Sequence, residues 1–282
     1  MYSELNLDLQ AFAKRVYDSI LYNSTFYKFL NGAYIGTLRQ TGAPVIEIAK
    51  TDALSVHVRA TKEIQSALDP ALTTYTHTMV DLTELNMDYA IRVPLMITGS
   101  DITNAIQDAV DLEDSAIAKQ IDTYGYGKLA SASMDEAEWD PTTQQDYIDL
   151  LTGLKAKLFN KDVYGDYRLG LGATEYGRLV SALTSVLKFE TLAGREGVDM
   201  GEVGRAYGVD AIFPINDAML KDEKGYFFNP IAVVGDTFFS AFVQTASDIR
   251  YPGYFCISGT QSFGAEVVRP EAIIRLVEEV SS

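Results

Sequence analysis

The segment from Gly36 to Pro94 constrains the fold most, because it alternates polar and apolar residues before any helical pattern that could cover it. The alternation is clearest over 55–60, 76–82 and 85–93, with a polar loop or tip at 61–74. Alternation with a period of about two residues is typical of half-buried antiparallel strands. An isolated two-stranded ribbon is marginally stable in water, and its apolar face and open edges need a partner. The sequence therefore predicts a long β-ribbon completed by another copy of the chain.

The stretch Thr98–Ala132 follows this ribbon and has apolar residues at helical spacing. Ser100 or Asp101 suits the N-cap of a first short helix, and the acidic residues at 108–114 suit the first turn of a second. We therefore predict a break near 108–111, a long helix over about 112–129, and weakening or bending near Gly125 and Gly127. Such a two-part helix would let one spine adapt its bend to slightly different environments.

The remaining sequence predicts an α+β arrangement. Residues 9–30 have a helical rhythm, and five aromatic residues there are expected to pack on another part of the chain: Tyr17, Tyr22, Phe26, Tyr27 and Phe29. After a polar break at 134–141, helices are predicted at 144–159 and 174–187, with strands at 166–173, 207–215 and 225–234. An exposed loop at 193–204 and a turn at 221–225 lie between these elements. The tail returns to strands at 238–245, 254–258 and 265–268, followed by Pro270 and a final segment at 273–280, so the chain leaves one domain and comes back to it.

Charge and composition exclude several classes of protein. The 282 residues carry a net charge of −16, without a basic run that could hold nucleic acid through its phosphates. There is no apolar run long enough to cross a bilayer, and the N-terminus lacks the pattern of a signal peptide. The single cysteine, Cys256, excludes an intrachain disulfide and favours a reducing compartment.

No motif in the sequence predicts catalysis, a cofactor or a metal. The stretch 170–175 lacks the third glycine of a dinucleotide-binding turn and is interpreted as a tight strand-to-helix turn, and 125–129 departs from a Walker loop. His57 and His77 lie 20 residues apart with Asp81 as the one further metal-ligand candidate, and 108–114 lacks calcium-loop spacing. Residues 260–264 miss the serine nucleophile pattern, and Cys256 in an apolar strand is expected to be core.

The order of elements resembles the major capsid protein of tailed bacteriophages, with its Hong Kong 97-type fold. Residues 39–48 resemble the entry to that family's extended loop, 91–102 the strand leading into its spine helix, 201–215 a turn and strand of its axial domain, and 253–259 and 263–273 its closing peripheral strands. The resemblance implies an N-terminal arm (1–35), an extended β-ribbon loop (36–94), a peripheral domain with the spine helix (95–132), an inserted axial domain (133–236) and returning peripheral strands (237–282).

What the resemblance implies is a non-enzymatic virion subunit that assembles with itself into pentamers and hexamers of an icosahedral head around double-stranded DNA. A separate scaffolding protein and a portal protein are expected partners, since the extended loop begins by about residue 36. The subunit would occupy the host cytoplasm before assembly. Lys50 and Lys62 lie where some relatives crosslink, but nothing selects them for such bonds. The expected contacts between subunits are Arg39, Glu47, Lys50, His57, Arg59, Lys62, Glu63, Tyr89, Arg195 and Glu196.

Two alternatives remain at this point. An encapsulin-type nanocompartment has the same fold and would enclose an enzyme, held by a cargo peptide in an inner pocket. An acidic α+β enzyme or ligand-binding protein would use the cleft between the 133–236 module and the rest of the chain. The acidity itself suggests a shell lining that repels packaged DNA and lets it slide during filling.

Overall fold

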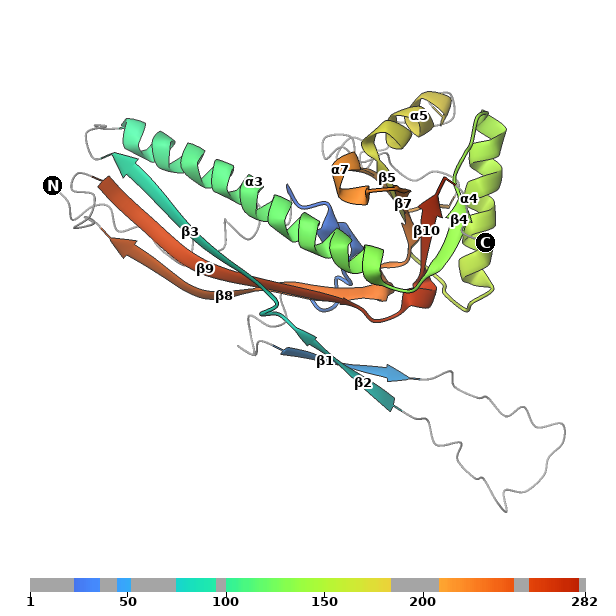
Figure 1. Ribbon diagram of the computed structural model, residues 1–282, viewed down its shortest axis with the longest axis horizontal. Helices are drawn as coiled ribbons and strands as arrows, with labels where there is room; N and C mark the ends of the chain where they lie inside the picture. Colours follow the sequence, from blue (N-terminus) through green and yellow to red (C-terminus); the bar gives the residue numbers. More distant parts are fainter. Residues whose placement is uncertain are drawn as a thin grey trace, which may run out of the picture.

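The computed structural model describes residues 23–35, 45–51, 75–94, 100–183, 208–245 and 254–278. A long helix, α3, lies along a three-stranded sheet, a separate lobe sits at the helix C-terminus, and a two-stranded ribbon projects away from the body (Figure 1). Both helices and sheets contribute, as the predicted α+β class requires.

The spine is one uninterrupted helix, α3 (Ser100–Ser131), of 32 residues. The predicted break near 108–111 is therefore wrong, and the acidic residues at 108–114 lie inside the helix instead of at a start. The helix follows the sheet along its length (Figure 1), so packing outweighs a local signal for a new N-terminus. Continuity through this stretch also removes the basis for a two-part spine that bends at a break.

Gly125 has a packing role, not the bending role predicted for it. A Cβ at this position would lie 2.3 Å from the Phe26 ring, so only glycine lets that ring rest on the helix. The helix continues through Gly125 and Gly127 to Ser131.

The three-stranded sheet has the order β3–β9–β8, all antiparallel. Strand β3 (Leu85–Pro94) confirms the predicted alternation, and β8 (Val233–Thr245) starts earlier than predicted. Strand β9 (Tyr254–Val267) is one strand of 14 residues that contains 254–258 and 265–267, so these residues are confirmed as strand and the predicted gap between them is wrong. Partners on both sides hold residues 259–264 extended despite two glycines.

The lobe is built on a five-stranded sheet with the order β4–β10–β7–β5–β6. Its strands are β4 (Asp135–Glu138), β5 (Arg168–Gly172), β6 (Ala211–Ile215), β7 (Glu223–Phe228) and β10 (Ile273–Val277). Its helices are α4 (Gln144–Phe159), α5 (Ala173–Leu183) and α7 (Asp217–Leu220). Short 3₁₀ helices, η2 (Pro230–Ala232) and η3 (Pro270–Ala272), join it to the other sheet.

Helix α4 has the predicted bounds, and its N-terminus explains why. Thr143 and Asp146 form a capping box, in which each side chain accepts a backbone N–H of the other residue. By contrast, β4 and α7 were not predicted. Strand β4 was missed because its residues are polar except Ala137 and pair in parallel with the distant β10.

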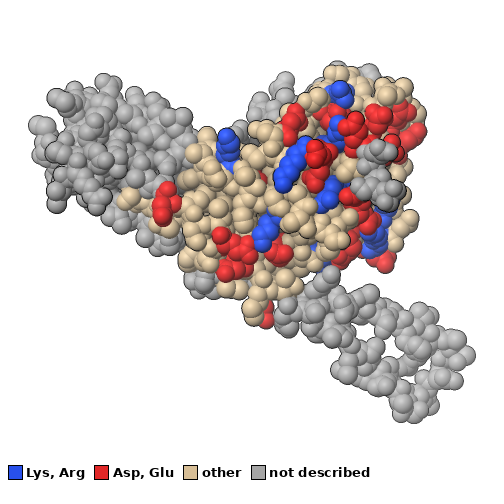
Figure 2. Space-filling model, viewed as in Figure 1, with Lys and Arg blue, Asp and Glu red and all other residues tan. Residues whose placement is uncertain are grey.

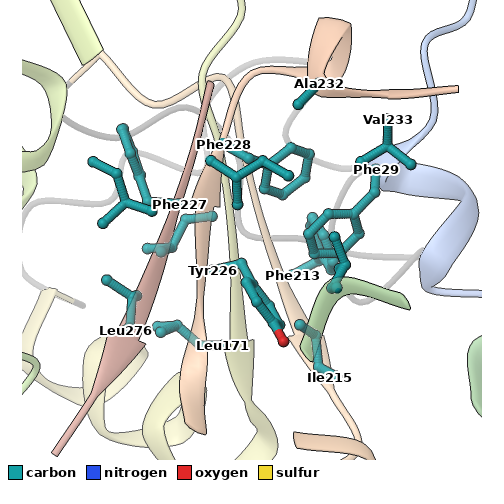
Figure 3. Packing of buried hydrophobic residues seen from close by; sticks show 14 of the residues in the cluster. Phe29, Leu171, Phe213, Ile215, Tyr226, Phe227, Phe228, Ala232, Val233 and Leu276 are labelled. Carbon is teal, nitrogen blue, oxygen red and sulfur yellow. The ribbon is translucent and has the colours of Figure 1, made fainter. Parts of the chain in front are cut away.

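The core lies where the arm, the spine and the lobe meet. In the arm, the 3₁₀ helix η1 (Phe26–Phe29) buries Phe26, Tyr27 and Phe29, which confirms that these aromatics pack on other elements. The ring of Phe29 stacks on Phe228 at 4.0 Å between centroids, beside Tyr226 (Figure 3). The other predicted helical residues of the arm, 9–22, lie outside the described part of the chain, as do the loop at 193–204 and the helix end at 184–187.

Candidate assembly surfaces

The ribbon pairs β1 (Val45–Thr51) with β2 (Tyr75–Asp81) in antiparallel register, Val45 opposite Asp81 and Glu47 opposite Met79. One face packs against the three-stranded sheet, where Ile48 and Val80 join a small apolar cluster with Leu82, Val234 and Val268. The opposite face leaves Val45 40% and Met79 70% exposed. On this face each exposed apolar side chain lies opposite an acidic residue, Val45 opposite Asp81 and Met79 opposite Glu47. Exposed apolar side chains on a thin ribbon fit a surface that another chain covers.

The predicted contact residues fall unevenly on the described structure. Glu47 lies exposed on β1, Lys50 lies on the same strand opposite Thr76, and Tyr89 lies on β3 opposite Gly259. The structure does not bring Tyr89 into the ribbon, because its strand belongs to the three-stranded sheet. The other seven predicted residues lie outside the described residues: Arg39, His57, Arg59, Lys62, Glu63, Arg195 and Glu196.

A tight turn joins the ribbon to the body. Asp81 accepts hydrogen bonds from the Thr83 N–H and hydroxyl at 2.8 and 2.7 Å, which lowers the pKa of Asp81. Strand β9 passes directly beneath, and a Cβ on Gly264 would lie 1.9 Å from the Asp81 carbonyl oxygen. The ribbon crosses the sheet only because that position carries no side chain.

Ion pairs then tie the ribbon root to the spine. Lys128 of α3 bonds Glu84 at 2.7 Å and Glu266 at 3.2 Å, and the Tyr124 hydroxyl donates to Glu84. These bonds lower the pKa of Glu84, and burial together with the bond to Glu84 raises the pKa of Tyr124 to about 12. Burial alone would lower the pKa of Lys128, but its two carboxylate partners raise it overall.

The arm is held by a buried carboxylate on the same helix. Asp122 accepts from the Ser24 hydroxyl at 2.5 Å, from the Thr25 N–H and hydroxyl at 3.2 and 2.9 Å, and from the Phe26 N–H at 2.9 Å. Burial raises the pKa of Asp122, while these donors act in the opposite direction. Sequence reasoning missed this anchor, because its partners lie nearly a hundred residues apart and only the helical spacing Asp122–Tyr126 hinted at a shared face.

Arg275 of β10 closes the C-terminus of the spine. Its guanidinium donates to the carbonyls of Leu129, Ala130 and Ala132 at 2.9–3.2 Å. It also pairs with Glu223 at 2.9 Å and Glu136 at 3.4 Å. A cation here satisfies carbonyls that a helix end leaves open and suits the negative end of its dipole.

The sequence motifs that were excluded as catalytic, cofactor or metal sites belong to ordinary helices and strands. Residues 170–175 form the direct passage from β5 into α5, and 125–129 lie within α3. His77 lies in β2 opposite Ala49, and Cys256 in β9 opposite Arg92. Within the described ranges, no group of three or more His, Cys, Asp or Glu side chains could hold a metal ion. No helix in the described ranges is long and apolar enough to cross a membrane.

Comparison with solved structures assigns the class of fold. The chain has the Hong Kong 97-type fold of phage capsid proteins, as the order of elements predicted. A chain from Mycobacterium phage Che8 superposes with a TM-score of 0.61 at 19% identity, covering 92% of both chains.

Two further structures have the same arrangement at lower identity. A capsid chain of the Cyanophage P-SCSP1u gives a TM-score of 0.55 at 16% identity, covering 85% of this chain and 84% of that chain. A virus-like particle from Pyrococcus furiosus gives 0.53 at 10%, covering 93% and 96%. No protein-family model matches the sequence, and no curated protein matches it. Because the identities are this low, the likeness establishes the fold.

Proposed function

We propose that this chain is a non-enzymatic major capsid protein, which assembles with itself into the icosahedral head of a tailed bacteriophage around double-stranded DNA. The observation that carries the proposal is the ribbon, a thin two-stranded projection (Figure 1) whose outer face exposes Val45 and Met79 near its root. Exposure of such apolar side chains to water costs free energy, which contact with a neighbouring subunit would recover. The fold shared with the capsid of the Cyanophage P-SCSP1u supports the same conclusion.

In this assembly the subunit contacts copies of itself in pentamers and hexamers. The axial domain would comprise 133–236, the peripheral domain 95–132 and 237–282, and the extended loop 36–94. The described sheets cross these limits, because β3 joins the peripheral sheet and β10 joins the sheet of the lobe. A separate scaffolding protein and a portal are the expected partners, with localisation in the virion and, before assembly, the host cytoplasm.

The charge of the chain suits enclosure of DNA without specific binding. The net charge is −16, and on the face shown in Figure 2 acidic and basic side chains gather over the lobe. An acidic lining would repel the phosphate backbone and let the genome move during packaging. Acidic side chains concentrated on the outer surface of assembled particles would contradict this part of the proposal.

The test is assembly of the purified protein, alone and co-expressed with its genomic neighbours, followed by sedimentation and negative-stain microscopy. We expect closed or tubular shells. Met79→Lys should abolish them while changing the free energy of unfolding of the subunit by less than about 0.5 kcal/mol, since Met79 is exposed. Gln145→Lys, which adds the same charge at an exposed position of α4, is the control and should assemble normally. A chain that stays monomeric at high concentration in every condition would overturn the proposal.

A nanocompartment shell is the second candidate, supported by the likeness to the Pyrococcus furiosus virus-like particle. The two candidates differ in what the particle encloses. Particles recovered from the native source with packaged DNA support the phage head, whereas particles filled with a protein cargo and lacking a genome support the nanocompartment.

A further inference from the structure

A groove of about 600 Å³ runs between strand β4 and helix α4 on the lobe. Ala137 and Glu138 line it from the strand, and Leu150, Gly153 and Leu154 line it from the helix. Its size lies within the range of sites that accept ligands or short peptide segments.

One wall of this groove is an open sheet edge. Strand β4 is outermost in the five-stranded sheet and pairs on one side, with β10. The Trp139 N–H donates to the Val277 carbonyl at 2.8 Å. Because alternate residues of a strand direct their backbone groups to opposite edges, the N–H and C=O of Glu138 point away from β10. No strand pairs with that edge within the described ranges.

The opposite wall is a helix face that leaves room for a backbone. A Cβ on Gly153 would meet no atom within 4 Å. Leu150 is partly buried and supplies apolar contact at this wall for a side chain of an extended segment, while Leu154, which is 2% exposed, forms the floor. The groove therefore offers backbone hydrogen bonds on one side and apolar packing on the other, which is the arrangement of strand addition to a sheet edge.

Charge indicates which segment would bind. Four carboxylates line the groove against one lysine, Lys157: Glu138, Asp140, Asp146 and Asp149. Asp146 is committed to the cap of α4, and Asp149 accepts from the Gln145 amide at 2.8 Å. Glu138 and Asp140 are exposed and form no ion pair with any described residue. Two uncommitted carboxylates beside an open edge favour a basic partner.

We propose that this groove binds an extended, lysine- or arginine-bearing segment of a partner protein, which adds as a strand to the edge of β4. The carboxylates of Glu138 and Asp140 pair with its basic side chains, and its apolar side chains lie on Leu150 and Leu154. This inference does not depend on the proposed shell function, because it uses only the lobe of one subunit.

The experiment measures fluorescence anisotropy of fluorescein-labelled decapeptides with the full-length protein. The probe alternates lysine and valine; one control peptide replaces lysine with glutamate, and another replaces valine with proline, which cannot donate to a strand edge. We expect saturable binding of the lysine–valine peptide and at least about tenfold weaker binding of both controls, a difference of about 1.4 kcal/mol.

Two substitutions locate the site. The Cβ of Gly153→Leu meets no atom within 4 Å, and the rest of the side chain would occupy the groove, so binding should weaken at least about tenfold while the helix propensity of α4 rises. Gly127→Leu is its matched control, since it is also helical, exposed and without contacts, and should bind like the parent. Glu138→Lys with Asp140→Lys should abolish binding, whereas Asp222→Lys on an exposed turn should not.

Three results would overturn the proposal. The first is no saturable binding of the lysine–valine peptide. The second is that the proline peptide binds as tightly as the lysine–valine peptide, or that the Gly153→Leu variant binds the lysine–valine peptide as tightly as the parent. Either result would mean that the peptide is attracted by charge to an acidic surface and does not add as a strand. The third is a change in oligomeric state of Gly153→Leu relative to Gly127→Leu without any peptide, which would mean that another copy of this chain occupies the groove.

Discussion

Two anchors on neighbouring turns of α3 hold the arm and the ribbon by different interactions. The arm is fixed by Asp122, which is 8% exposed and accepts four hydrogen bonds from residues 24–26. The ribbon root is fixed by Lys128, whose side chain is 29% exposed and pairs with two carboxylates that are 37% and 43% exposed. Buried hydrogen bonds to a charge are strong and unscreened, whereas half-exposed ion pairs are weak and sensitive to salt.

In the proposed shell, this contrast would decide which part of the subunit has a fixed position before assembly. The described part of the arm, residues 23–35, joins a closely packed aromatic core, so its position is determined by the chain itself. The ribbon contributes Ile48 and Val80 to a cluster of only five buried residues, so modest energies set its orientation, and contacts with another subunit would exceed them.

Phe29→Ala should destabilise the packing of the arm more than any other substitution considered. Phe29 is fully buried and contacts five other rings, those of Phe26, Tyr126, Phe213, Tyr226 and Phe228. Its loss should lower the free energy of unfolding by about 3–5 kcal/mol, measured by urea denaturation of the unassembled subunit. Phe159→Ala, at a ring that is 55% exposed, is the control and should cost far less. Equal losses would show that the arm does not belong to the core.

Asp122→Ala tests the buried anchor itself. Removing the carboxylate leaves donors of Ser24, Thr25 and Phe26 without an acceptor, and should cost about 1–3 kcal/mol of unfolding free energy. Limited proteolysis should also cut the arm faster in this variant. The control is Asp149→Ala, which removes a single exposed hydrogen bond; a similar loss there would contradict a special role for Asp122.

The sequence predicted those elements whose signals are local. Helix α4 was predicted with its bounds because the capping box and the apolar spacing lie within its own residues. The break in α3 was wrongly predicted because acidic residues at 108–114 look like a helix start when the sheet beneath them is unknown. Strand β4 was missed because its pairing with β10 joins residues about 140 positions apart in the sequence.

The features of the candidate assembly surfaces also differ in whether their sequence signal is local. The alternation of 76–82 identified the ribbon strand that carries Met79, because a strand pattern is visible locally. Neither the Asp122 anchor nor the Arg275 cap was predicted, since each depends on where distant segments meet in space.

Gln261→Met tests a buried polar side chain that differs from Asp122 in its hydrogen bonding. Gln261 lies fully buried in β9, and among the described residues neither its amide nitrogen nor its amide oxygen has a hydrogen-bond partner. Methionine has similar volume and no such requirement, so the variant should be more stable by about 1 kcal/mol in urea denaturation. Gln145→Met on exposed α4 should give no gain. A destabilised Gln261→Met variant would show that the amide is satisfied in the subunit.

Glu84→Gln addresses the ribbon root and has the smallest expected effect. The pKa of Glu84 lies below its usual value of 4.5, so its contribution to stability is present above that pH and is lost as the pH falls through the lowered value. At pH 7 the variant should lose less than about 1 kcal/mol, because the pair with Lys128 is half-exposed. Urea denaturation should show the loss shrink as the pH falls below 4.5 through the lowered pKa, and also in 1 M salt, where a charge pair at the surface is screened over about 3 Å. Glu138→Gln, without an ion pair among the described residues, should show neither dependence. A loss as large as that of Asp122→Ala, unchanged by salt, would mean that the ribbon root is held as firmly as the arm.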